Sequence, residues 1–149
     1  MSVKFQLASR EMPLIIVPVM VSGAKASRIT MAIVDTGATG CVLTEALADE
    51  IGAKHLEVPK SEKDAHGIGG KMSVEFVKVK EICLDKAVSR NLKVAVMDMS
   101  QIKEQFKIAR VPKKRDAELI LGYTFFKDHQ LKIDYKTKVL SIQPSTRGK

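Results

Sequence analysis

The residues best suited to chemistry follow a short apolar run in the first third of the chain. Ile29 to Val34 predicts a strand that enters a hydrophobic core, and Asp35, Thr36 and Gly37 come directly after it. An ionised carboxylate where burial begins costs free energy unless it is hydrogen-bonded or paired, and a functional role is one reason to keep it. The ordinary alternative is a strand that ends in a turn, because Asp and Gly are common turn residues.

A second unusual stretch is rich in glycine. Gly67-Ile68-Gly69-Gly70 cannot form a stable helix or central strand. Residues 72–80 alternate apolar and polar side chains over much of their length, which predicts a half-buried strand, so the glycines are expected at a hairpin tip. That tip is either an ordinary mobile turn or a flap, in which glycine lets the backbone approach a ligand and Ile68 supplies an apolar contact.

The elements that must position these residues are mostly strands. A length of 149 residues fits one domain, 1–149, with a core over about 12–143. A short helix is predicted over 45–51, with Thr44 as its N-cap and Gly52 as its stop, and helical spacing recurs within 99–110 and 124–130. The sequence therefore predicts a mainly β protein with small helices. Strands are expected at 12–21, 28–34, 42–43, 72–84, 92–97, 118–121, 131–135 and 139–142.

Composition narrows the class of protein. Hydrophobic residues make up 45% and charged residues 28%, which is typical of a globular chain. No apolar run approaches the length of a membrane span and the N-terminus does not resemble a secretory signal, so we expect a cytoplasmic protein without membrane contact. Cys41 and Cys83 lack the spacing of metal ligands and need not pair. No metal or other cofactor is predicted.

The basic charge raises nucleic-acid binding as an independent hypothesis. The formal net charge is +8, and Lys113-Lys114-Arg115 forms a cluster whose role the sequence leaves open. However, the cations are spread along the chain, aromatic residues are only 5%, and no nucleic-acid motif is present. A solvated surface is therefore the favoured interpretation.

Three landmarks, taken in order, resemble the retropepsin-like aspartic protease family, which includes single-domain bacterial proteins similar to retroviral proteases. They are the run Ile33 to Thr39, the glycines of 67–70, and Ile120-Leu121-Gly122 followed by a helix and a strand through Tyr135. The resemblance implies a closed β-barrel of the acid-protease fold, with one or two short helices, that forms a homodimer. The segment before Met12 and the charged insert 99–116 lie outside the landmarks.

The resemblance also implies an activity. Aspartic proteases hydrolyse peptide bonds with a water activated by two carboxylates that share one proton, so that one acts as base and the other as acid. This chain has no second Asp-Thr-Gly or Asp-Ser-Gly and is too short for two lobes. The second carboxylate is therefore expected to be Asp35 of the partner subunit.

The family's pattern assigns roles to individual residues of this chain. Asp35 supplies the dyad, Thr36 hydrogen-bonds across the dimer, and Gly37 allows close approach of the substrate. The expected substrate-binding residues are Ala38 together with Gly67, Ile68, Gly69 and Gly70 of the flap. An extended peptide or protein substrate would pair as an added strand beneath the flap, with apolar side chains at the cut.

Two alternatives to an active protease remain open. The first is a catalytically silent dimeric module of the same fold that binds peptides or serves a structural role, because a fold does not prove activity. The second, less favoured, is a basic protein that binds nucleic acid. Peptide turnover that disappears in Asp35→Asn would distinguish the protease from both.

Overall fold

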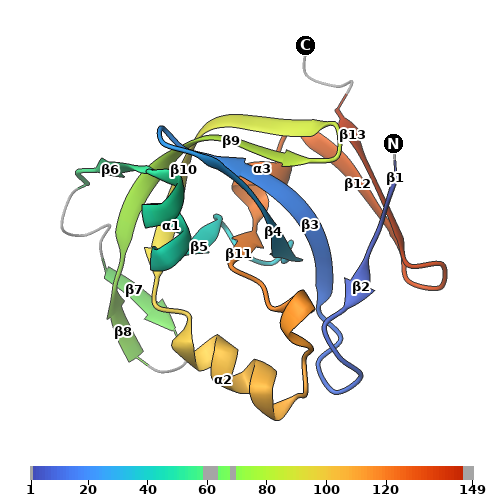
Figure 1. Ribbon diagram of the computed structural model, residues 1–149. Coiled ribbons are helices and arrows are strands. Elements are labelled where there is room, and N and C mark those ends of the chain that lie inside the picture. The colour runs from blue at the N-terminus through green and yellow to red at the C-terminus, as the bar shows by residue number, and fades with distance from the viewer. Residues whose placement is uncertain (1, 59–63, 68–69, 146–149) are drawn as a thin grey trace.

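The computed structural model describes residues 2–58, 64–67 and 70–145 and places a closed β-barrel at the centre of the protein (Figure 1). Six strands follow one another around it in the order β3-β4-β11-β5-β10-β9, and antiparallel pairing of β3 with β9 closes the ring. This confirms the predicted mainly β, closed-barrel fold. The barrel strands are β3 (Ile15–Ser22), β4 (Ser27–Val34), β11 (Leu119–Leu121), β5 (Val42–Thr44), β10 (Ala87–Met97) and β9 (Glu75–Leu84).

Short strands extend the barrel sheet at two points and form a second sheet beside it. β2 (Gln6–Leu7) pairs with β3, and β6 (Lys54–Leu56) pairs with β9. The second sheet has the order β1-β13-β12, so the segment before Met12 is part of the folded structure, with Phe5 and Ala8 both buried. Its strands are β1 (Ser2–Lys4), β12 (His129–Asp134) and β13 (Val139–Pro144).

The glycine-rich stretch forms the predicted hairpin. β7 (Asp64–Gly67) and β8 (Gly70–Ser73) pair antiparallel, with Gly67 opposite Gly70 at the end of the ladder. The expected tip residues, Ile68 and Gly69, lie outside the described residues. Val74 separates this hairpin from β9 and is buried, so the hairpin leaves the barrel where its sheet begins.

The structure contains more helices than the one or two expected. They are α1 (Glu45–Ile51), α2 (Ser100–Ile108) and α3 (Tyr123–Phe126), and the 3-10 helix η2 (Lys113–Arg115) follows α2. α2 lies within the predicted helical spacing of 99–110, and its Ile102 and Phe106 pack on the barrel. α3 is a single turn since β12 already begins at His129. In the described part of the chain no helix is long and apolar enough to cross a membrane.

The boundaries of α1 agree with the predicted capping. Thr44 Oγ1 accepts a hydrogen bond from the Leu47 amide at 3.2 Å, which satisfies one of the free N–H groups of the first turn. Gly52 ends the helix with a φ of 68°, a left-handed conformation that glycine adopts without steric cost.

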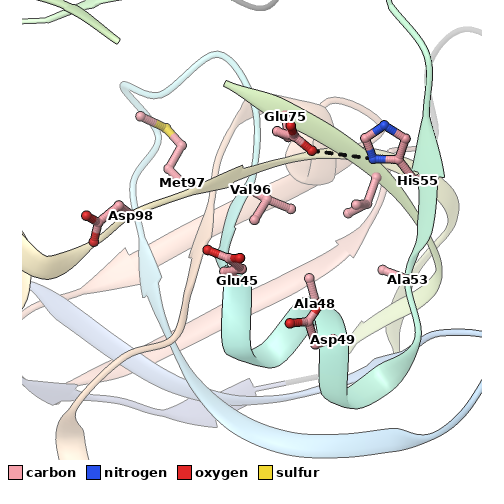
Figure 2. Close-up of a pocket in the computed structure, with 10 residues that line it drawn as sticks. Glu45, Ala48, Asp49, Ala53, His55, Glu75, Val96, Met97 and Asp98 are labelled. Atoms are coloured by element: carbon pink, nitrogen blue, oxygen red, sulfur yellow. Dashed lines mark ion pairs between the residues drawn. The ribbon is translucent and has the colours of Figure 1, made fainter. Parts of the chain in front are cut away.

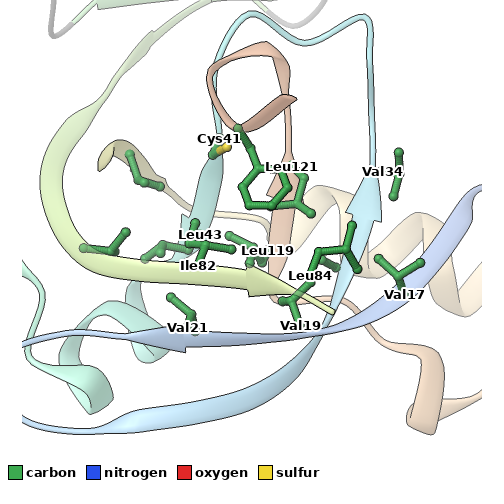
Figure 3. Close-up of a cluster of buried hydrophobic side chains, with 14 of the residues drawn as sticks. Val17, Val19, Val21, Val34, Cys41, Leu43, Ile82, Leu84, Leu119 and Leu121 are labelled. Atoms are coloured by element: carbon green, nitrogen blue, oxygen red, sulfur yellow. The ribbon is translucent and has the colours of Figure 1, made fainter. Parts of the chain in front are cut away.

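Two apolar clusters lie on the two faces of the barrel wall. The inner cluster fills the barrel, and Val17, Val19 and Val21 of β3 point into it at alternate positions (Figure 3). The outer cluster lies beneath α2, where Phe106 packs with Ile16 and Ile33. The strand that leads to Asp35 is therefore covered on both faces.

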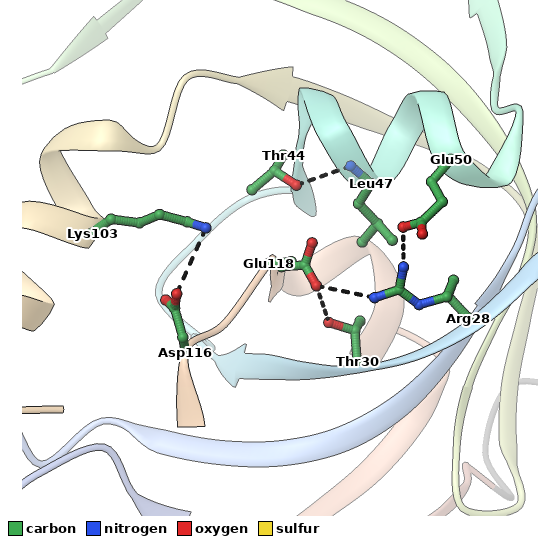
Figure 4. Close-up of polar contacts among 8 residues, drawn as sticks. All are labelled: Arg28, Thr30, Thr44, Leu47, Glu50, Lys103, Asp116 and Glu118. Atoms are coloured by element: carbon green, nitrogen blue, oxygen red, sulfur yellow. Dashed lines mark hydrogen bonds and ion pairs between the residues drawn. The ribbon is translucent and has the colours of Figure 1, made fainter. Parts of the chain in front are cut away.

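Polar contacts fix the start of β11 against β4. Glu118 Oε1 accepts a hydrogen bond from Thr30 Oγ1 at 3.0 Å and lies 3.5 Å from Arg28 Nη2 (Figure 4). Arg28 also forms an ion pair with Glu50 of α1. These contacts join the start of β4, α1 and the residue before β11, so they fix the parallel register that carries β4 to the Asp35 loop at its other end.

Candidate active site

Asp35 follows the last residue of β4 and is held by backbone contacts. Its amide donates to the Leu121 carbonyl at 2.9 Å, which continues the parallel pairing of β4 with β11. Its Oδ1 accepts from the Gly37 amide at 3.2 Å, and its carbonyl accepts from the Ala38 amide at 3.1 Å. The turn therefore fixes the direction of the carboxylate through main-chain groups.

The Asp35 carboxylate lies at the boundary of the core and is exposed in the single chain. Val34 is the last residue of β4 and is buried, whereas the next three residues, Asp35, Thr36 and Gly37, are all exposed. The apolar strand ends one residue before the acid, so water solvates the charge when one subunit stands alone. The single chain therefore pays no cost for a buried charge at position 35, and it needs no cation beside Asp35.

Gly122 holds the other side of the loop. Its amide points to Cys41 Sγ at 3.4 Å, and the next amide, of Tyr123, donates to the Ala38 carbonyl at 2.8 Å. A Cβ at position 122 would lie 2.1 Å from the Gly40 carbonyl oxygen. Only glycine fits this approach, which explains why an apolar strand that ends in glycine accompanies the Asp35 motif.

The loop of one chain supplies one acid. Among the described residues, the Gly37 amide is the hydrogen-bond partner of the Asp35 carboxylate, and no cationic side chain forms an ion pair with it. Thr36 is exposed, and its hydroxyl bonds to no described residue. Hydrolysis by an activated water needs both a base and an acid within hydrogen-bond reach. One Asp35 carboxylate cannot fill both roles in the same step.

Two exposed apolar side chains flank the loop and were not predicted. Tyr123 is 59% exposed although its amide bonds to the Asp35 loop. Leu14 is 36% exposed and lies two residues before Ile16, the residue that pairs with Ile33 of β4. Nothing in their sequence neighbourhood distinguishes them from core residues, so only the fold shows that both lie at the edge that carries Asp35.

A cavity of about 450 Å³ at the base of the β7–β8 hairpin is separate from this loop (Figure 2). His55 of β6 lies there with Nδ1 3.5 Å from Glu75 of β9 and Nε2 3.6 Å from Glu57. When His55 is protonated, these contacts join the strands on either side of the hairpin. Asp35 does not line the cavity.

Comparison with known proteins decides the family. The model of the aspartyl protease family matches residues 17–125, which include the Asp35 loop and Gly122. The chain belongs to the aspartyl protease family. The family match makes it an aspartic-type endopeptidase, and its fold is retropepsin-like. No curated protein sequence matches it.

Solved structures share the fold of this aspartyl protease at low sequence identity. A retropepsin-like aspartic protease from Rickettsia conorii has a TM-score of 0.56 at 16% identity, over 94% of this chain and 86% of that one. The EIAV protease complexed with the inhibitor HBY-793 has a TM-score of 0.50 at 18% identity, over 76% and 85%. The retroviral protease-like domain of Ddi1 from Leishmania major also has a TM-score of 0.50, at 17% identity over 87% and 88%.

Proposed function

We propose that the protein is an endopeptidase whose active site forms between two copies of the chain. Each copy is proposed to be one domain and to supply half of that site. The observation that carries this proposal is the Asp35 carboxylate, which is fixed by its own loop, is exposed, and is hydrogen-bonded to the Gly37 amide and to no acid of the described residues. A two-fold axis beside the loop would bring the two Asp35 carboxylates together. Their repulsion would leave one protonated as acid and the other ionised as base.

The surface around the loop supports this pairing. The Thr36 hydroxyl is available to hydrogen-bond across the two-fold axis. Tyr123 and Leu14 present exposed apolar area at the same edge, and burying such area stabilises a dimer by roughly 25 cal/mol per Å². The homodimer would thus desolvate the site that the single chain leaves open.

We propose that the substrate binds between the Asp35 loops and the β7–β8 hairpin. Ala38 and the glycines Gly67 and Gly70, with Ile68 and Gly69 of the tip, are the proposed contacts. Glycine backbone would lie close to an extended peptide, and the hairpin would exclude water when it closes. The substrate class is a peptide or protein, which the chain would bind as an additional strand.

The test is cleavage of a diverse peptide library by wild type and Asp35→Asn. Asn is nearly isosteric and retains an oxygen that accepts from the Gly37 amide, but it cannot shuttle the proton, so we expect a folded protein without peptidase activity. Asp85→Asn is the matched control, because Asp85 is exposed in the β9–β10 turn with a φ of 54° that Asn readily adopts. Equal cleavage by wild type and Asp35→Asn would refute the assignment.

Subunit mixing tests the shared site. Wild type and Asp35→Asn, co-refolded in equal amounts with random pairing, should give about one quarter wild-type dimers, and mixed dimers should be nearly inactive. Activity per mole of chain should also fall on dilution below the dimer dissociation constant. Activity proportional to the fraction of wild-type chains, rather than to its square, would show that each chain works alone.

A further inference from the structure

The insert between β10 and β11 concentrates positive charge. Residues 103–116 contain six cations and two carboxylates, which is half of the chain's net charge of +8. Two cations are engaged: Lys103 Nζ lies 3.7 Å from Asp116 Oδ2, and Arg115 Nη1 donates to the Leu7 carbonyl at 3.1 Å. The other four are exposed and pair with no carboxylate in the described part of the chain. We call them the basic ridge: Lys107, Arg110, Lys113 and Lys114.

The fold places the insert that carries this ridge against the strand that leads to Asp35. The inner face of α2 packs through Phe106, which is 3% exposed, onto Ile33 of β4. Ile33 lies two residues before Asp35, so α2 covers the outer face of β4 close to the end from which the Asp35 loop leaves. Figure 1 shows α2 on the outside of the barrel, from where the chain leads into β11, the strand that bonds to Asp35.

We infer that the basic ridge is a second recognition surface, which selects polypeptide substrates that carry an acidic stretch next to the apolar residues at the cut. This inference rests on the proposed peptidase function. A peptide held in front of Asp35 extends beyond the catalytic loop, and Glu or Asp side chains in its flanking segment meet the four exposed cations of the ridge. Ile108, 70% exposed on the same helix, offers an apolar contact to that segment.

Other occupants fit this surface less well. Phe106 is the only aromatic residue in 99–116 and is buried, so there is no platform on which bases can stack. Ile108 alone provides too little apolar area for a helix to lie in a membrane interface. A second copy of the chain that met this surface with its own ridge would bring the same positive charge and be repelled there. An acidic polypeptide satisfies both the charge and the single apolar contact.

Binding is tested first without turnover, on the Asp35→Asn protein. Fluorescence anisotropy compares a labelled (Glu-Ala)5 peptide with (Gln-Ala)5 at low salt. We expect the acidic peptide to bind about tenfold more tightly, and most of this preference to vanish at 0.5 M salt because exposed charges are then screened. Equal affinity for the two peptides would overturn the inference.

Matched variants locate the surface. Lys107→Gln/Lys113→Gln/Lys114→Gln should weaken binding of the acidic peptide about five- to tenfold. Lys78→Gln/Lys80→Gln/Lys86→Gln removes three exposed lysines from β9 and its turn, and should leave binding nearly unchanged. Equal losses in both variants would mean that net charge, rather than the ridge, governs binding. Tighter ridge-dependent binding of a single-stranded oligonucleotide or of anionic vesicles would overturn the choice of a polypeptide.

The catalytic arm uses the wild-type enzyme and one cleavable peptide from the library, extended by an acidic or a neutral tail. We expect the acidic tail to lower KM several-fold with kcat unchanged, and the ridge variant to abolish that difference while cleaving the neutral peptide as wild type does. If both tails give the same KM, the inference fails and the proposed function stands. If neither peptide is cleaved, the proposed function fails, and the substrate role with it.

Discussion

Gly122→Ala is expected to disturb both the stability of the protein and the geometry of the Asp35 loop. The added Cβ would lie 2.1 Å from the Gly40 carbonyl oxygen and 2.8 Å from the Ala38 carbonyl oxygen. Its backbone φ is −117°, so the conformation suits alanine and the conflict is purely steric. The neighbours are main-chain atoms of the catalytic loop, which cannot turn away as a side chain would.

The size of the conflict sets the expected cost. Real Cβ contacts essentially never fall under 3.0 Å, so the Gly40 carbonyl must move by about 0.9 Å. Forcing atoms into a packed site typically costs about 1–3 kcal/mol, and a displacement of main chain belongs at the upper end of that range. For a domain of this length, a loss of about 3 kcal/mol lowers Tm by roughly 10 °C.

Denaturant unfolding and peptidase assays on three variants separate the two effects. Gly40→Ala is the steric control, because its Cβ would meet nothing within 4 Å. Gly23→Ala is the stability control: its Cβ would lie 2.3 Å from the Ile51 carbonyl oxygen, at the opposite end of β4 from Asp35. We expect Gly23→Ala and Gly122→Ala to lose similar stability, and only Gly122→Ala to lose kcat at a temperature where both remain folded.

Two outcomes would refute this reasoning. If Gly122→Ala unfolded at the same denaturant concentration as wild type, the close approach of position 122 to the loop would be absent in solution. If Gly23→Ala lost as much kcat as Gly122→Ala, the loss would report general destabilisation, and Gly122 would have no special part in holding Asp35.

Three further perturbations have expected outcomes. Thr44→Ala removes the acceptor for the Leu47 amide and should lower the free energy of unfolding, measured with denaturant, by about 1 kcal/mol. Thr44→Ser keeps a hydroxyl acceptor and should retain most of that stability. Thr36→Val should weaken dimer association by about 1 kcal/mol per hydrogen bond lost, measured by sedimentation; unchanged association would remove Thr36 from the interface. Burial, with a hydrogen bond to Glu81, raises the pKa of Cys83 from 9.0 to about 11. The unfolded thiol then ionises before the folded one, so the free energy of unfolding should fall between pH 9 and 11, and Cys83→Ala should lack that decrease.

Local signals in the sequence predict a large part of this fold. The apolar runs of β3 and β4, the capping residues Thr44 and Gly52 of α1, and the closing hairpin depend on neighbours in the chain, and each was confirmed close to its predicted bounds. The turn at 135–138 is an example: the Asp134 carboxylate accepts from the Lys136 and Thr137 amides at 3.0 and 3.1 Å. These hydrogen bonds, that of Thr137 foremost, lower the pKa of Asp134.

Features that depend on distant partners were not predictable in the same way. β1 has three residues and no distinctive pattern, and it is a strand only because β13 lies beside it. The exposure of Asp35 depends on where β4 ends relative to β11, which no periodicity reports. The proposed roles of Asp35, Thr36 and the hairpin glycines remain predictions, because they require a second subunit and a substrate.

The pairing of β1 with β13 has a kinetic consequence. Val3 pairs with Leu140, so β1 leaves the ribosome with its partner strand still 137 residues away along the chain. At 5–20 residues per second, the ribosome needs roughly 7–30 s to supply that partner. During this time the segment that ends in the apolar Phe5 is an unpaired edge, able to add to other nascent chains, and contacts of such high sequence separation form slowly. The sheet that joins the two ends of the described chain should therefore be the last part to fold.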